Sequence, residues 1–139
     1  RFRQEGAPPA EDPSDELAYA EFLAARGEAA AAAEAYLRAM GGELDASDRR
    51  DALLGAAKAF APSDPARASE HLRAWSAALK AAADQASAAS EATAPKSSER
   101  EAAERRARRL LIRRAIVARS RELTPLREQP VWAEVFPAK

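Results

Sequence analysis

The residues that could do acid–base or metal chemistry are few in this chain of 139 residues, and they form no recognisable motif. His71 is the single histidine, and no Cys, Gly-rich phosphate loop or Gly-x-Ser-x-Gly sequence accompanies it. A general base needs an oriented partner and a nucleophile or substrate within reach. The acidic pairs Asp48/Asp51 and Glu101/Glu104 stand at predicted helix starts, where carboxylates favour the helix dipole. We therefore expect no catalytic residue, metal site, cofactor or small-molecule substrate, and no enzymatic activity.

Arginine is the other chemically distinctive side chain, and it concentrates near the C-terminus. Residues 98–123 carry nine Arg against four Glu, whereas residues 1–61 carry seven Lys and Arg against twelve Asp and Glu. The guanidinium fork suits carboxylates and phosphates, so Arg105, Arg109 and Arg113 are candidate contacts to an anionic partner. Four partners stay open for these arginines: the chain's own acidic half, an acidic protein, RNA, or an anionic membrane surface.

Composition predicts closely packed helices and favours a protein partner. Hydrophobic residues make up 47% of the chain but aromatic residues only 6%, so alanine, the strongest helix former, dominates. There is no cysteine, which rules out disulfides and thiolate metal sites. No apolar run approaches the roughly 20 residues of a membrane span. The net charge of zero and the lack of aromatic residues among the arginines disfavour nucleic acid.

Helix start and stop signals divide the chain into five predicted helices. Asp-Pro at positions 12–13 and 64–65 supplies a capping carboxylate and then a proline in the first turn. Gly27 and the pair Gly41-Gly42 end two of the helices. Ser98 followed by Glu101 is a capping box that opens the fifth helix. The predicted organisation begins with an extended arm over 1–12 and a helical-repeat domain over 13–84. Residues 85–97 are a Ser/Ala-rich linker or a frayed extension of the fourth helix. A long Arg-rich helix over 98–124 and an extended anchoring tail over 125–139 follow.

The first residue is Arg1, not Met. This indicates a processed protein or a piece of a longer one. It favours an organellar protein, mitochondrial or plastid, or an exported bacterial protein, and it leaves the cytoplasm open.

Two segments that lie 36 residues apart share one pattern of side chains. Each places a small residue, a large residue and a further core residue at spacing i, i+4, i+7, and a repeat of this length is typical of stacked helical hairpins. The matching positions are Tyr19, Ala20, Leu23, Gly27, Ala32, Tyr36 and Ala39 in the first unit and Leu54, Gly55, Ala68, Leu72 and Trp75 in the second. Over about residues 13–83 the chain resembles tetratricopeptide repeats. The resemblance implies a scaffold that holds peptides or subunits on a concave face, without catalysis.

Two apolar features lie outside the repeat-like part. The Arg-rich helix carries apolar residues on two faces, so one face is expected to pack on the hairpins and the other on a partner or a second copy. Its candidate partner contacts are Leu111, Ile112 and Ile116. The tail contains Trp132, Val135 and Phe136, which are candidate anchors in a partner's groove. The alternative for the tail is that these side chains cap the domain's own core.

We therefore predict an all-α protein made of two repeat-like hairpins, a long basic helix and an extended tail. The predicted function is that of a non-catalytic interaction protein or accessory structural subunit of a larger assembly, such as a respiratory or photosynthetic membrane complex. Its expected partners are other protein subunits, and peripheral association with a membrane complex stays open. The alternatives are an RNA- or ribosome-binding protein that uses the Arg-rich helix, and a peptide-binding adaptor of the tetratricopeptide type.

Overall fold

A computed structural model describes residues 12–137, and all regular structure within them is helical, with no β-strand. The predicted all-α class is confirmed. The predicted N-terminal arm lies outside the described residues, apart from Asp12. In chain order the helices are α1 (Pro13–Ala25), α2 (Ala29–Met40), α3 (Ala46–Phe60), α4 (Pro65–Ala92), α5 (Ser98–Val117), the 3-10 helix η1 (Arg121–Leu126) and α6 (Pro130–Val135).

Side-chain caps mark the starts of α1, α3, α4 and α5. The carboxylate of Asp12 caps α1 and that of Asp64 caps α4, and in both helices proline follows at the first position. Ser97, not Ser98, caps α5, because its hydroxyl accepts a hydrogen bond from the backbone N–H of Arg100 at 3.1 Å. The predicted capping box is therefore replaced by a cap one residue earlier.

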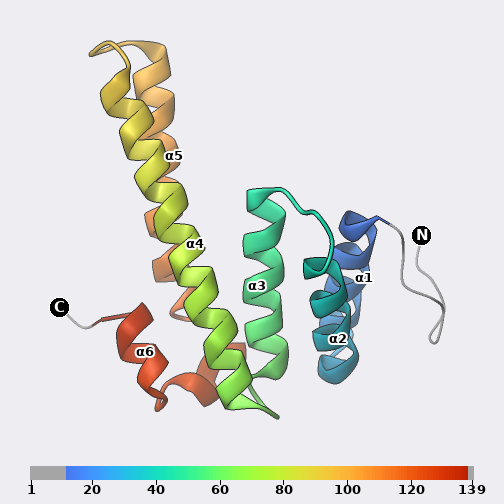
Figure 1. The fold of residues 1–139 in the computed structure, drawn as a ribbon. Helices are drawn as coiled ribbons and strands as arrows, with labels where there is room; N and C mark the ends of the chain where they lie inside the picture. Colours follow the sequence, from blue (N-terminus) through green and yellow to red (C-terminus); the bar gives the residue numbers. More distant parts are fainter. Residues whose placement is uncertain (1–11, 138–139) are drawn as a thin grey trace.

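The helices α1 to α5 form a row in which each packs antiparallel on the next (Figure 1). The central helix α3 is buried on two sides. Ala52, Ala56 and Ala59 pack in one core cluster with α1 and α2. Leu54 and Ala57 pack in a second cluster with α4 and the C-terminal segments. The two clusters therefore share α3 as a common wall.

Small residues let the first helices approach closely. Ala20 and Ala32 are completely buried between α1 and α2, as close helix packing requires. The ring of Tyr36, which is only 4% exposed, lies directly against Gly55 of α3. A Cβ atom at Gly55 would overlap this ring, so a glycine is needed where α2 and α3 meet.

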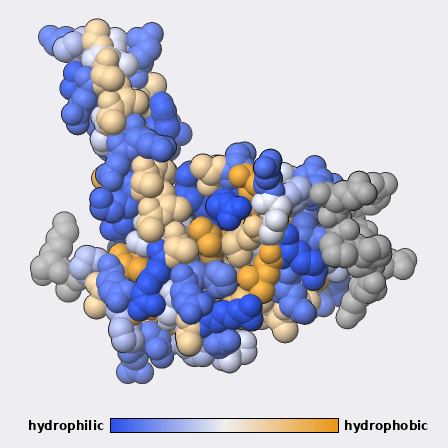
Figure 2. All heavy atoms as spheres, in the orientation of Figure 1, coloured by the Kyte–Doolittle hydropathy of each residue, from blue (hydrophilic) through white to orange (hydrophobic). Residues whose placement is uncertain are grey.

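Helices α4 and α5 form a long hairpin that projects beyond the rest of the molecule (Figure 1). Its outer part is covered by hydrophilic residues with weakly hydrophobic ones between them, as Figure 2 shows. Residues 85–92 belong to α4, so the predicted linker over 85–97 is reduced to residues 93–97. The alternative of an extended fourth helix holds, because α5 covers the outer half of α4 along a seam of small side chains. The buried members of this seam are Ala83, Ala86, Ser90 and Ala103.

The C-terminal segment folds back on the domain and is not an extended tail. Helix α5 ends at Val117, seven residues before the predicted end at residue 124. The chain then turns, and both η1 and α6 pack on α4. The buried side chains of this segment join the cluster around Leu72 and Trp75; they are Leu123, Leu126, Val131 and Val135.

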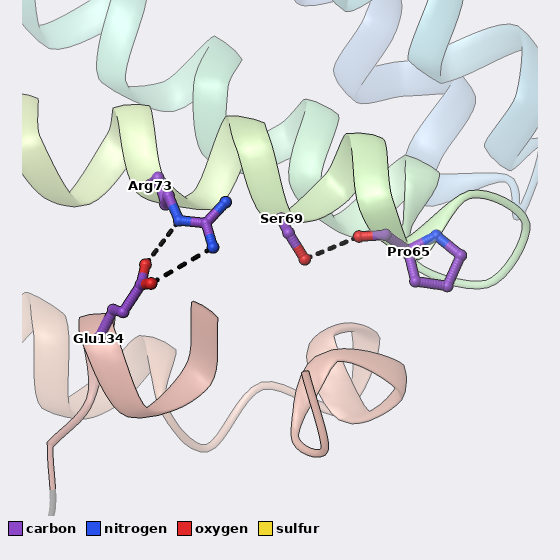
Figure 3. A network of polar contacts seen from close by, with 4 residues as sticks. All are labelled: Pro65, Ser69, Arg73 and Glu134. Atoms are coloured by element: carbon purple, nitrogen blue, oxygen red, sulfur yellow. Dashed lines mark hydrogen bonds and ion pairs between the residues drawn. The ribbon is translucent and has the colours of Figure 1, made fainter. Parts of the chain in front are cut away.

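A two-pronged ion pair at the surface attaches α6 to α4. The Nε and Nη2 atoms of Arg73 lie 2.5 Å and 3.4 Å from the two carboxylate oxygens of Glu134 (Figure 3). The hydrogen bond is the main reason that the pKa of Glu134 lies below its usual value. Next to this pair, the hydroxyl of Ser69 donates to the backbone oxygen of Pro65 at 2.8 Å. This second hydrogen bond lies within α4, so the pair of Arg73 and Glu134 is the polar contact drawn between the two helices.

Candidate binding groove between α3, α4 and α5

A groove of about 500 Å³ runs between α3 and α5, with α4 as its floor. We call it the arginine groove, after four of its lining residues. Helix α3 contributes Ser47, Arg50 and Asp51; α4 contributes Trp75 and Leu79; and α5 contributes Arg106, Arg109, Leu110, Ile112, Arg113 and Ile116.

The periodicity of α5 decides which side chains reach this groove. Ala103 and Val117 are buried, so they mark the face that packs on α4. Arg106, Arg109 and Arg113 recur at spacings of three and four residues, which places them on a neighbouring face of the same helix. Because the buried face of α5 packs on α4, this row of arginines lies along the edge of the groove.

The groove also contains apolar surface that the domain does not cover. Ile112 and Ile116 lie one helical turn apart and are 57% and 62% exposed. Within residues 12–137 the large hydrophobic side chains that are exposed all lie on α5, and Leu111 is the third. Beneath them, Trp75 and Leu79 close the floor and are nearly fully buried. The exposed isoleucines form a small contiguous apolar patch beside the arginines.

One ion pair connects the two walls of the groove. The Nη2 atom of Arg113 on α5 lies 3.5 Å from the Oδ1 atom of Asp51 on α3, and both side chains are substantially exposed. Asp51 is the groove's only carboxylate, whereas four of its lining residues are arginines. The positive charges that Asp51 leaves unbalanced make the groove a favourable place for anionic groups.

The structure separates the predicted contact residues of α5 into two sets. Ile112 and Ile116 line the groove together with Arg109 and Arg113. Leu111 lies on α5 outside the groove lining, because successive residues of a helix are turned by about 100°. Arg105 also lies outside the groove lining.

The predicted partner anchors of the tail pack against the domain's own core, where Val135 is buried and Trp132 and Phe136 are partly buried. Val135 is 2% exposed. Phe136 lies between two tryptophans, with ring centroids 6.4 Å from Trp75 and 4.4 Å from Trp132. Trp132 is in turn covered by the guanidinium of Arg127 at 5.3 Å. Of the two alternatives for the tail, capping of the domain's own core is the one that the structure supports.

Some groove residues were not identified from the sequence. Arg106 could have been found, because it continues the helical spacing of Arg109 and Arg113. Arg50 and Asp51 could not have been assigned to the groove from the sequence, because they lie on α3. They come close to α5 only because both helices pack on α4. Their position depends on tertiary structure, which the spacing within one helix does not contain.

His71, the single histidine, lies outside the arginine groove. His71 stacks on Phe60 with ring centroids 5.6 Å apart, and burial followed by the charge of Arg67 lowers the pKa of His71. No group of three or more His, Asp or Glu residues within 12–137 is arranged to hold a metal ion. In the same residues, no helix has the length and apolar character needed to cross a membrane. No protein-family model, curated protein or solved structure matches the chain.

Proposed function

We propose that this chain is a non-catalytic protein-binding module that serves as an accessory subunit of a larger protein assembly, with the arginine groove as its binding site. One observation carries the proposal: Ile112 and Ile116 are more than half exposed beside a row of arginines. Burying an aliphatic side chain of this size contributes about 1.5–3 kcal/mol. A pair of such side chains, framed by charges that fix orientation, is a typical centre for a protein interface.

RNA is the second candidate ligand, and the arginines alone favour it. Arginine pairs with phosphate as readily as with carboxylate. Binding to phosphate would weaken steeply with rising salt, whereas binding through the isoleucines would not. The net charge of zero and the aliphatic character of the exposed patch support the protein ligand.

The proposal is tested by native co-purification of the chain from its source cells at moderate salt, followed by mass spectrometry. Ile116→Glu places a charge in the groove, and Leu111→Glu places the same charge on α5 outside it. We expect one defined set of proteins to be retained with the unmodified chain and with Leu111→Glu, and lost with Ile116→Glu. Retention by all three chains, or recovery of RNA alone, would contradict the proposal.

A further inference from the structure

We infer that the arginine groove binds a short amphipathic helix of its partner, in which acidic residues flank an apolar stripe. We also infer that, in the free protein, Asp51 pairs with a groove arginine that binds a carboxylate of the partner in the complex. This inference rests on the proposed function, because it names the chemical class of ligand that the same groove takes.

The length of the groove matches a helix of about three turns. Its lining residues on α5 extend from Arg106 to Ile116, which corresponds to roughly 15 Å at 1.5 Å per residue. Both walls are helices packed on the floor helix α4. A further helix between α3 and α5 would extend the packing of side-chain ridges into grooves that already joins these elements.

The side chains of the groove specify what this helix must carry. Ile112 and Ile116 lie one turn apart, so they match apolar residues at spacing i, i+3 or i+4 on the ligand. Arg106 and Arg109 stand beside them on α5, and Arg50 faces them from α3. Glu or Asp on both sides of the apolar stripe would meet these guanidinium groups, and carboxylates suit their fork geometry.

The same groove is poorly suited to single-stranded RNA. Recognition of unpaired bases depends on aromatic rings that are free to stack with them. Trp75 is the only aromatic residue of the groove lining, and it is 1% exposed. The apolar part of the surface that a ligand would touch is aliphatic, so it favours the Leu, Ile or Phe side chains of a protein.

The ion pair between Arg113 and Asp51 joins a guanidinium group to a carboxylate, which is the kind of contact that we expect between the groove and an acidic ligand. Its atoms lie 3.5 Å apart and its side chains are 52% and 41% exposed, so an incoming carboxylate can reach Arg113 in place of Asp51. In the free protein Asp51 therefore competes with the ligand for this guanidinium group. Removing the charge of Asp51 should strengthen the binding of an acidic helix, although it removes a native ion pair.

The experiment titrates the full chain with a synthetic peptide by isothermal titration calorimetry. The peptide has about 16 residues, enough for four helical turns, with Leu at i, i+4, i+7 and i+11, Glu on both flanks, and Ala elsewhere. A second peptide carries Gln in place of every Glu. Poly(U) RNA is the competing anionic probe, and circular dichroism checks that each variant is folded.

Three pairs of variants separate the groove from the rest of the surface. Asp51→Asn should tighten peptide binding by about two- to fivefold, whereas Asp48→Asn, which removes the same charge outside the groove lining, should have less effect. Arg109→Gln should weaken binding by about two- to fivefold, and its control Arg105→Gln should not. Ile112→Ser should weaken binding by about tenfold, and its control Leu111→Ser should not.

The outcomes distinguish this inference from the proposed function. Equal effects of Asp51→Asn and Asp48→Asn would overturn the role given to Asp51. Absence of peptide binding, equal binding of the Gln peptide, or tighter binding of poly(U) would overturn the acidic helix as the ligand. If the co-purification still depended on Ile116 in that case, the groove would bind a protein of another class. If it did not, the proposed function would fail as well.

Discussion

The ring of Tyr36 on α2 fits closely against Gly55 on α3. The ring is buried, and burial followed by the charges of Glu21 and Asp51 raises the pKa of Tyr36 to about 12. A methyl group at Gly55 would overlap the ring. The ring has little room to move, because densely packed interiors allow few alternative positions.

Gly55→Ala should therefore destabilise the protein, although alanine favours helices by about 1 kcal/mol over glycine. We expect the free energy of unfolding to fall by about 1–2 kcal/mol, because overpacking in a core outweighs the gain in helix propensity. Chemical denaturation measures the change. In a Tyr36→Leu background the clash disappears, so Gly55→Ala should become neutral or stabilising. Destabilisation of equal size in both backgrounds would refute this explanation.

His71 gives the folded state a defined dependence on pH. Burial is the main cause that lowers the pKa of His71, so the unfolded chain binds this proton more tightly than the folded chain. The contribution of His71 to stability is therefore complete above about pH 6.5, falls as the pH drops toward the folded-state pKa, and is constant below it.

His71→Gln should remove this part of the pH dependence. We expect the free energy of unfolding of the unmodified chain to fall from pH 7.5 to pH 5.5 more than that of the variant. The pKa of Glu21 is raised mainly by burial, so Glu21 also makes stability depend on pH. Because Glu21 is present in both chains, its contribution cancels in the comparison. Parallel curves for the two chains would show that the proton of His71 is not coupled to folding.

Helix α6 shows how a few apolar residues connect a terminal segment to the core. Val131 and Val135 contact the cluster that contains Trp75, and Leu126 precedes them in η1. Each buried aliphatic side chain contributes about 1.5–3 kcal/mol, and typical domains are stable by only about 5–15 kcal/mol. The segment is therefore a structural part of the domain.

Truncation after Thr124 should lower the melting temperature sharply or leave the chain largely unfolded. This deletion removes three core side chains and exposes the surface of α4 that they cover. Thermal unfolding followed by circular dichroism measures the effect. The matched control is Glu134→Gln, which disrupts only the exposed ion pair with Arg73 and should melt close to the unmodified chain. A truncated chain that melts at the unmodified temperature would show that α6 does not contribute to the core.

The helices differ in how far the sequence determines them. Starts were predictable where a carboxylate precedes proline, as at Asp12 and Asp64, because the signal is local. The extension of α4 to Ala92 was not fixed by a local signal, since its Ala and Ser residues become a buried seam only when α5 covers them. The return of the tail was predictable only as one of two alternatives. The surface that receives Val131 and Phe136 is made by α4, which lies far away in the chain.

Residues 12–137 contain two core clusters, and α3 connects them. Phe60 packs against both clusters. Ala52, Ala56 and Ala59 of α3 face one cluster, while Leu54 and Ala57 face the other. If α3 leaves either cluster, it also exposes apolar surface of the other cluster. We therefore expect residues 12–137 to unfold as one cooperative unit, although the helices are arranged in a row with contacts mainly between neighbours.

Leu23→Ala tests this cooperativity across the molecule. Leu23 is 5% exposed in the cluster of α1 and α2, so the substitution should lower the free energy of unfolding by about 2–4 kcal/mol. Both tryptophans, Trp75 and Trp132, belong to the other cluster and report on it by fluorescence. If α3 joins the clusters into one unit, the fluorescence midpoint in denaturant shifts as far as the midpoint measured by circular dichroism. A fluorescence midpoint that stays at the unmodified value would mean that α1 and α2 unfold separately from the domain that carries the arginine groove.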